Sequence, residues 1–341
     1  MRIATYNIEW FDALFDVDGR LLLDGGWSRR HNVTRQQQLE AIAMVLTALD
    51  ADAVMVIEAP DSSRRRNGDE ALQRFAAHFG LRARKALSGF ENTTQQEISL
   101  LYDPDVLTAR HDPKGEETGK KGSFDAPRFD GVFRRDLDVD AAPELITFSK
   151  PPLEVALQTK AGALLRLIGV HIKSKAPHGA RGKVEVMRKA IENRRKQMAQ
   201  CIWLRQRVEA HLAAHESVIV LGDFNDGPGL DEYEKLFGRS SVEIVLGEDG
   251  QDCLFDPHAQ MILSRKLGPK PATSRFYIKH EKRYLSVLLD YIMVSADLCK
   301  LGPEWRIWHP FEDPECYDIA ELREALLAAS DHFPVTIDLD I

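Results

Sequence analysis

Polar side chains follow a short apolar run in the segment Ser217 to Asp226. The run Val218 to Leu221 predicts a buried strand. Asp223 and Asn225 come directly after it, so a carboxylate and a carboxamide stand two residues apart at a strand end. Such groups can bind a hard cation or orient a water molecule. Asp, Asn, Gly and Pro are also ordinary turn residues, so this segment alone does not decide between a site and a turn.

The same form recurs along the chain. Further apolar runs end in, or contain, a carboxylate, an amide or a histidine: Asn7, Glu58, His171, Asp290 and the segment Ser330-Asp331-His332. Each has a structural explanation when taken singly. Together they are hard to explain in this way, because burying uncompensated carboxylates beside apolar strands is costly. A shared metal and phosphate site accounts for all of them.

The ordered set resembles the endonuclease/exonuclease/phosphatase superfamily, which includes pancreatic-type deoxyribonucleases, apurinic endonucleases, neutral sphingomyelinases and inositol polyphosphate 5-phosphatases. The resemblance runs from Asn7 to His332. It implies an α/β fold, a four-layer α/β/β/α sandwich with two packed, mainly antiparallel sheets, in a single domain over residues 1–341. The chain departs from the family pattern at Lys150-Pro151, where many members have Arg-Pro, and at Ala59-Pro60 after Glu58.

Phosphate-ester hydrolysis needs a hard cation, an activated water and a group that carries the charge of the leaving oxygen. Glu58 is the best single metal ligand, and the resemblance adds Asn7 and Asp331. Oxygen ligands favour Mg²⁺, with Mn²⁺ as the alternative. The expected role of Asp223 is to orient or deprotonate the attacking water, and that of Asn225 is to bind the phosphoryl oxygens.

Two carboxylate–histidine pairs are expected to flank one phosphate. The first joins Asp290 to His332, which would contact the phosphate. The second joins Glu97 to His171 and would protonate the leaving oxygen; it matches the deoxyribonuclease-like branch of the family. Which group is the base and which the acid stays open at this point. Lys173 and Lys175 share the face of His171 in an extended segment and are expected to bind substrate phosphates, although a solvated strand end explains them equally well.

The elements that must position these residues alternate between strands and helices. Periodicity predicts helices over Thr34–Leu49, Gly68–Phe79 and Glu185–His215, and strands over Glu97–Tyr102, Leu153–Leu157, Leu164–Ile172, Val287–Val294 and Val335–Leu339. Residues 110–145 are interpreted as an insertion or loop, and residues 227–285 as substrate loops or a lid.

Composition limits the remaining choices. The 341 residues are 44% hydrophobic and 29% charged, as in ordinary globular proteins. We expect no membrane span, because no apolar run approaches about 18 residues. Four cysteines far apart and an N-terminus without a signal pattern favour the cytoplasm. The net charge of −8 argues mildly against unspecific nucleic-acid binding.

The leading hypothesis is metal-dependent hydrolysis of phosphodiester bonds by a nuclease acting on DNA. The alternatives are a phosphatase or phosphodiesterase for a small phosphate or phospholipid headgroup, and a catalytically silent binding scaffold. The expected partner is a phosphate-ester substrate, nucleic acid first, and no protein partner is inferred.

Overall fold

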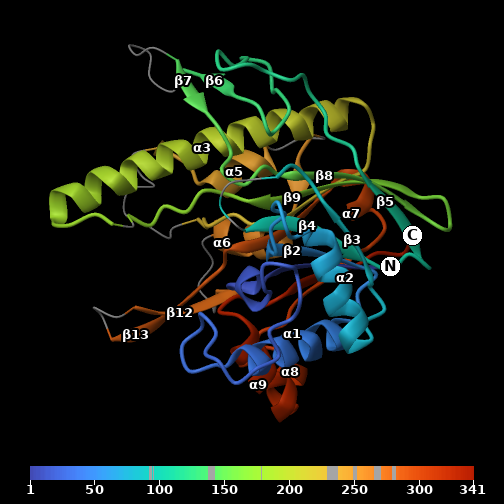
Figure 1. Ribbon diagram of the computed structural model, residues 1–341. Coiled ribbons are helices and arrows are strands. Elements are labelled where there is room, and N and C mark those ends of the chain that lie inside the picture. Colours follow the sequence, from blue (N-terminus) through green and yellow to red (C-terminus); the bar gives the residue numbers. More distant parts are fainter. Residues whose placement is uncertain are drawn as a thin grey trace.

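The computed structural model consists of two six-stranded sheets packed face to face, with helices covering the outer face of each (Figure 1). It describes residues 1–91, 94, 96–136, 143–177, 179–228, 237–248, 252–264, 270–278 and 282–341. The expected four-layer α/β/β/α sandwich is confirmed. The sheets are mainly antiparallel, as predicted, but each contains one parallel pair.

The first sheet has the strand order β15-β16-β1-β2-β4-β3. Its strands are β15 (Glu304–Ile307), β16 (Val335–Asp338), β1 (Arg2–Asn7), β2 (Ala53–Ala59), β4 (Glu97–Tyr102) and β3 (Lys85–Ser88). Only the neighbours β1 and β2 run parallel. Its outer layer comprises α1 (Arg35–Leu49), α2 (Gly68–Phe79), α8 (Pro314–Asp318) and α9 (Ala320–Ala329).

The second sheet has the order β11-β14-β10-β9-β8-β5. Its strands are β11 (Leu254–Phe255), β14 (Asp290–Ser295), β10 (Val218–Asp223), β9 (Leu164–His171), β8 (Leu153–Thr159) and β5 (Leu107–His111). Only β9 and β10 run parallel. The long helix α3 (Lys183–Ala213) and α5 (Ser241–Leu246) cover its outer face.

Smaller elements lie around this frame. They are η1 (Phe11–Leu14), α6 (Pro257–Leu263), α7 (Ala296–Cys299) and the two-stranded ribbons β6 (Phe133–Arg135) with β7 (Glu144–Ile146) and β12 (Ser274–Ile278) with β13 (Arg283–Val287). The β12–β13 ribbon and the first turns of α3 both project beyond the sheets, on the side away from the two termini (Figure 1).

Alternation along the central strands produces the layers. Successive strand residues face opposite sides of a sheet. In β10, Ile219 and Leu221 therefore enter the core between the sheets, whereas Val218 and Val220 pack under α3. In β1, Ile3 faces the second sheet and Tyr6 faces the helical layer. Strands buried on both faces are apolar throughout, which is why they were recognisable as short apolar runs.

Local signals fix where the helices begin. Thr34 accepts a hydrogen bond from the Gln37 backbone and Gln37 reaches back, forming a capping box for α1. At α2 the Asn67 side chain accepts a hydrogen bond from the Glu70 backbone, and Gly80 ends the helix in the left-handed conformation. A buried ion pair joins α3 to β8, where Arg207 Nη1 lies 2.7 Å from Glu154 Oε1.

Three sequence expectations need correction. Residues 110–145 are not all loop, because they contain β6 and reach the start of β7. Residues 227–285 include α5, α6 and the β12–β13 ribbon, although 229–236, 249–251, 265–269 and 279–281 lie outside the described residues. The apolar run 287–294 is not one strand, since β13 ends at Val287 and β14 begins at Asp290. In the part of the chain that is described, no helix is long and apolar enough to cross a membrane.

Candidate active site

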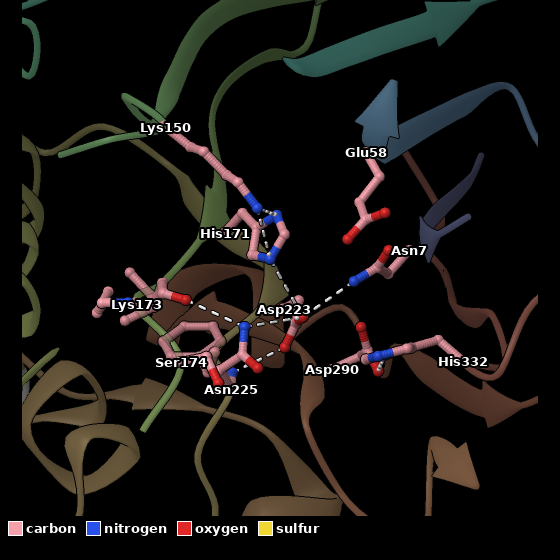
Figure 2. Close-up of polar contacts among 12 residues, drawn as sticks. Asn7, Glu58, Lys150, His171, Lys173, Ser174, Asp223, Asn225, Asp290 and His332 are labelled. Carbon is pink, nitrogen blue, oxygen red and sulfur yellow. Dashed lines mark hydrogen bonds and ion pairs between the residues drawn. The ribbon is translucent and has the colours of Figure 1, made fainter. Parts of the chain in front are cut away.

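The carboxyl ends of four central strands meet at one rim of the two sheets (Figure 2). Because β1 and β2 run parallel, Asn7 ends its strand beside the end of β2, where Glu58 lies. Because β9 and β10 run parallel, His171 lies directly opposite Asp223. Parallel neighbours finish at the same edge of a sheet, so each parallel pair delivers two polar side chains to this rim.

Asp223 lies at the centre of a hydrogen-bond network. Its Oδ2 accepts from Asn7 Nδ2 at 2.9 Å and from Asn225 Nδ2 at 3.1 Å, and its Oδ1 accepts from the Asn225 backbone at 2.7 Å. Burial raises the pKa of Asp223 to about 7, against the lowering influence of His332. The carboxylate is thus fixed in orientation and poised to exchange a proton near neutral pH.

The expected contact between Asp290 and His332 is present. Asp290 begins β14, opposite Asp223 in the register, and its Oδ2 lies 2.8 Å from His332 Nδ1. Thr273 Oγ1 donates a second hydrogen bond to the same oxygen at 2.8 Å. Burial by itself lowers the pKa of His332, but the Asp290 carboxylate more than compensates and raises it well above the ordinary value. His332 therefore carries a positive charge in the site.

Ser330 explains why a serine precedes Asp331 and His332. Its hydroxyl donates to the Asn7 carbonyl at 2.7 Å and accepts from the backbone of Glu9 and of His332, both at 3.1 Å. The loop before β16 is thereby fastened to the end of β1. Its contacts to Asn7 and His332 are to backbone atoms, so the Ser330 side chain positions the segment.

Glu58 lies on a β-bulge. The pairing of β2 with β4 shifts between Ile57 and Ala59, and Glu58 has φ 64°. This left-handed conformation is costly for a residue with a side chain. Burial raises the pKa of Glu58, against a hydrogen bond from the Trp10 backbone to Oε2 at 2.9 Å. A strained and desolvated carboxylate is typical of a functional position.

The residues around Glu58 fit a hard divalent cation. Asp331 is one of the charges that raise the pKa of Glu58, so the two carboxylates lie close enough to repel each other. Asn7 Oδ1 is buried and, among the described residues, has no hydrogen-bond partner. An oxygen-only set of two carboxylates and one unsatisfied amide oxygen suits Mg²⁺. Glu9 lies in the same field, and burial together with Asp331 raises its pKa to about 7.

A second cluster of the site could also be interpreted as a metal site. Asp223, Asp290 and His332 can bring one ligand atom each within 4.8 Å of one another. However, His332 is charged and hydrogen-bonded to Asp290, and Asp223 already accepts three hydrogen bonds. This cluster is therefore better suited to proton transfer than to cation binding.

His171 contacts Lys150, which the sequence did not predict. Lys150 Nζ lies 3.0 Å and 3.2 Å from the two ring nitrogens, and Asp223 Oδ2 lies 3.6 Å from Nε2. Burial and the Lys150 charge lower the pKa of His171 well below its ordinary value. Glu97 pairs with Ala59 in the other sheet. The expected pair of Glu97 with His171 stays a prediction.

Lys150 is a residue of the candidate site that the sequence analysis did not predict. It is largely buried, burial lowers its pKa, and Glu58 and Asp223 are the first charges to oppose that effect. A cation between two carboxylates and a neutral histidine can bind a phosphoryl oxygen. The sequence signal for this residue is the Lys150-Pro151 pair, which stands where many family members have Arg-Pro.

The other three expected substrate contacts differ in outcome. Lys175 Nζ forms an ion pair with Asp226, so its charge is used within the protein. Lys173 is half-buried, and Lys189 and Lys196 are near enough to lower its pKa after burial itself. Asn225 Nδ2 donates to the Ile172 carbonyl at 3.1 Å as well as to Asp223, so a phosphoryl contact would require one of these bonds to break.

The bulge strain predicts an unusual stability ranking at Glu58. The free energy of unfolding should be about 1 kcal/mol higher for Glu58→Gly than for Glu58→Ala, because only glycine adopts a positive φ without cost. Urea unfolding in the presence of a chelator measures the difference. At the exposed helical position Glu40 the same two replacements should rank in the opposite order. Equal stability of the two Glu58 variants would contradict the strain.

The chain is similar to several solved structures and matches one family model. A humanized D. rerio TDP2 with 14 mutations has a TM-score of 0.52 at 12% identity, covering 100% of this chain and 99% of that one. An AP endonuclease from Archaeoglobus fulgidus has a TM-score of 0.49 at 11% identity, with 100% of both chains covered. A 3′ phosphatase from Neisseria bound to a product DNA hairpin has a TM-score of 0.49 at 15% identity, again with 100% of both chains covered. No curated protein sequence matches significantly. The model of the Endonuclease/Exonuclease/phosphatase family matches residues 4–332, and the chain belongs to that family.

Proposed function

We propose that this protein is a Mg²⁺-dependent phosphodiesterase that cleaves DNA, with residues 1–341 forming one catalytic domain. The observation that carries the proposal is the convergence of oxygen groups that suit a cation with the Asp290–His332 pair and Asp223 on one rim. Members of this family hydrolyse phosphate esters, so the chemistry follows from the family and the DNA substrate is the added step.

Asn7, Glu58 and Asp331 would hold the cation. When bound, it would polarise a phosphoryl oxygen and offset the negative charge that develops there. Mn²⁺ has similar oxygen chemistry and is the alternative ion. The repulsion between Glu58 and Asp331, together with the unsatisfied Asn7 oxygen, supports this assignment.

Asp223 would accept a proton from the attacking water, while Asn7 and Asn225 hold its carboxylate in place. Water oxygen then bonds to phosphorus, and the bond to the leaving oxygen breaks. His332, charged through its 2.8 Å contact with Asp290, lies on the side of the site where it can stabilise the phosphoryl group or donate a proton. Lys150 and the neutral His171 would bind a phosphoryl oxygen from the opposite side.

A local cationic rim supports a polyanionic substrate in spite of the net charge of −8. Lys173 follows His171 by two residues, and Lys189 and Lys196 on α3 are close enough to perturb it. A nuclease needs positive potential only where the strand lies. The four cysteines are free thiols, which fits a reducing compartment, and we place the protein in the cytoplasm.

The cation requirement is the first test of the function. Excess chelator should abolish cleavage of DNA, and Mg²⁺ should restore it. Glu58→Gln should raise the Mg²⁺ concentration needed for half-maximal turnover by about 10-fold or more. The amide lacks the charge of a carboxylate that would hold the cation, and even the loss of a group that only supports a metal ligand costs about 10-fold or more in affinity. Glu40→Gln, on the exposed face of α1, should change nothing. Full turnover in excess chelator would contradict the proposed cation requirement.

The Asp290–His332 pair should act as a unit. Asp290→Asn and His332→Ala should each lower turnover by about 10²-fold, the usual scale for a lost acid–base group. The double variant should lose little more than either single one, since removing one partner already disables the other. Replacement of the exposed His31 by Ala is the control. If the losses of the two single variants multiply in the double variant, the two residues act independently and the prediction is wrong.

Salt dependence distinguishes DNA from a small phosphate ester. If Lys173 contacts a strand phosphate, Lys173→Ala should reduce the log–log salt slope of DNA binding by about 0.7–0.9, one released counterion. Lys160→Ala is the matched control, because this exposed lysine lies in the β8–β9 turn at the opposite strand ends. An unchanged slope would exclude Lys173 from the DNA contact. Turnover of small phosphomonoesters without any DNA cleavage would favour the small-phosphate alternative.

A further inference from the structure

The β12–β13 ribbon begins directly at the candidate active site. Arg275 donates its backbone N–H to the Asp331 carbonyl at 2.8 Å, and Ser274 Oγ donates to the same oxygen at 3.0 Å. Ser274 also bridges to His332. Thr273, the residue before the ribbon, binds Asp290. The ribbon then projects away from the sheets (Figure 1), so anything lying along it extends outward from the reacting phosphate.

One side of this ribbon carries exposed aromatic rings. Tyr277 and Tyr284 are cross-strand partners with ring centroids 5.2 Å apart, and they are 49% and 54% exposed. The Arg275 guanidinium lies 3.8 Å from the Tyr284 ring centre and 5.3 Å from that of Phe311, which is 44% exposed. We call Tyr277, Tyr284, Arg275 and Phe311 the aromatic strip.

The charge of Arg275 is available to a ligand. In the part of the chain that is described, no carboxylate forms an ion pair with it, and its guanidinium lies only against ring faces. Most other arginines near the site have an acidic partner, as Arg30 has in Glu9. An unpaired cation stacked on an exposed tyrosine and an exposed phenylalanine is suited to a ligand that offers both flat rings and negative charge.

We propose that the aromatic strip is a stacking platform for unpaired bases, so that the enzyme binds a single-stranded segment of DNA beside the cleaved phosphate. This rests on the proposed function. Bases stack on exposed aromatic rings when they are free of a duplex, and arginine adds contacts to ring faces and phosphates. A strand whose phosphate occupies the site would lie with its next nucleotides along the ribbon.

A purely structural role does not account for the strip. A cross-strand aromatic pair stabilises a ribbon by only about 0.2–1 kcal/mol, and this explains the Tyr277–Tyr284 contact. It does not explain why Arg275 is held between Tyr284 and Phe311, a residue of the loop after β15, with its charge unpaired. Nor does it explain why the rings stay half exposed at the edge of the site.

The test compares two oligomers that differ only in their bases. One is a short labelled oligothymidylate, and the other is a chain of the same length made of abasic tetrahydrofuran units. Binding is measured by fluorescence anisotropy in excess chelator, so that it does not depend on turnover. The wild type should bind the oligothymidylate more tightly. Tyr277→Ala/Tyr284→Ala should weaken that binding at least ~10-fold and leave the abasic chain unchanged.

Matched variants separate stacking from other effects. Tyr277→Phe/Tyr284→Phe keeps the rings and should bind as the wild type does. Tyr317→Ala removes a tyrosine that is 53% exposed and also faces an arginine, Arg323 at 5.2 Å, but lies on α8. It should have no effect. Equal loss of binding to both oligomers, or none to either, in the alanine variant would overturn the platform.

The same variants distinguish this inference from the proposed function. Cleavage of the abasic chain in Mg²⁺ depends on the site and not on bases, so the alanine variant should cleave it at the wild-type rate. Base-dependent binding without cleavage of either oligomer would refute the nuclease function while leaving the platform intact. Cleavage of both oligomers without base-dependent binding would support the nuclease function and refute the platform.

Discussion

The position of one parallel strand pair at the centre of each sheet is the constraint on which the site depends. All other neighbours are antiparallel, so their ends alternate between the two rims. The pairs β1–β2 and β9–β10 each end together. Because the sheets stack face to face through one apolar core, these two double ends lie opposite each other. One sheet thus supplies Asn7 and Glu58, and the other supplies His171 and Asp223. The antiparallel neighbours β14 and β16 begin at the same rim and add Asp290 and the loop that carries His332.

This concentration of polar groups has an energetic cost that the rest of the molecule must offset. Burial raises the pKa values of Glu58 and Asp223, and lowers that of Lys150, so each is less stable in its charged form than in water. The left-handed Glu58 adds backbone strain. Three apolar cores, one between the sheets and one under each helical layer, supply the compensation. A silent scaffold would gain nothing from keeping strained and desolvated acids together, so the cost itself favours catalysis over the scaffold alternative.

The sequence was sufficient for features that depend on short-range pattern or on the ordered motif. Apolar runs located the central strands, and the order of Asp290 and Ser330-Asp331-His332 predicted a contact that the structure contains. Prediction from the sequence failed where the partner of a side chain comes from a distant segment. Alternation placed Lys173 and Lys175 on one face, but could not reveal that Asp226, 51 residues away, pairs with Lys175. Position in a strand suggested Glu97 as the partner of His171, but could not reveal that Lys150, from the loop before β8, contacts this histidine. The run 287–294 was apolar enough for one strand, although its chain changes sheets at Leu288 and Leu289.

Net charge is a poor guide to the substrate because much of it is cancelled locally. Arg82 alone pairs with Asp50, Asp52 and Asp103, far from the catalytic rim. The proposed DNA substrate would meet the rim itself, where Lys150, Lys173 and His332 lie among the carboxylates. Without these cations, the acids proposed to hold a metal would also repel a polyanion. The projecting start of α3 and the β12–β13 ribbon extend this rim in two directions (Figure 1). Lysines on the helix contribute charge, and the ribbon contributes rings. If the substrate is DNA, as proposed, the helix would suit its phosphates and the ribbon would suit its bases.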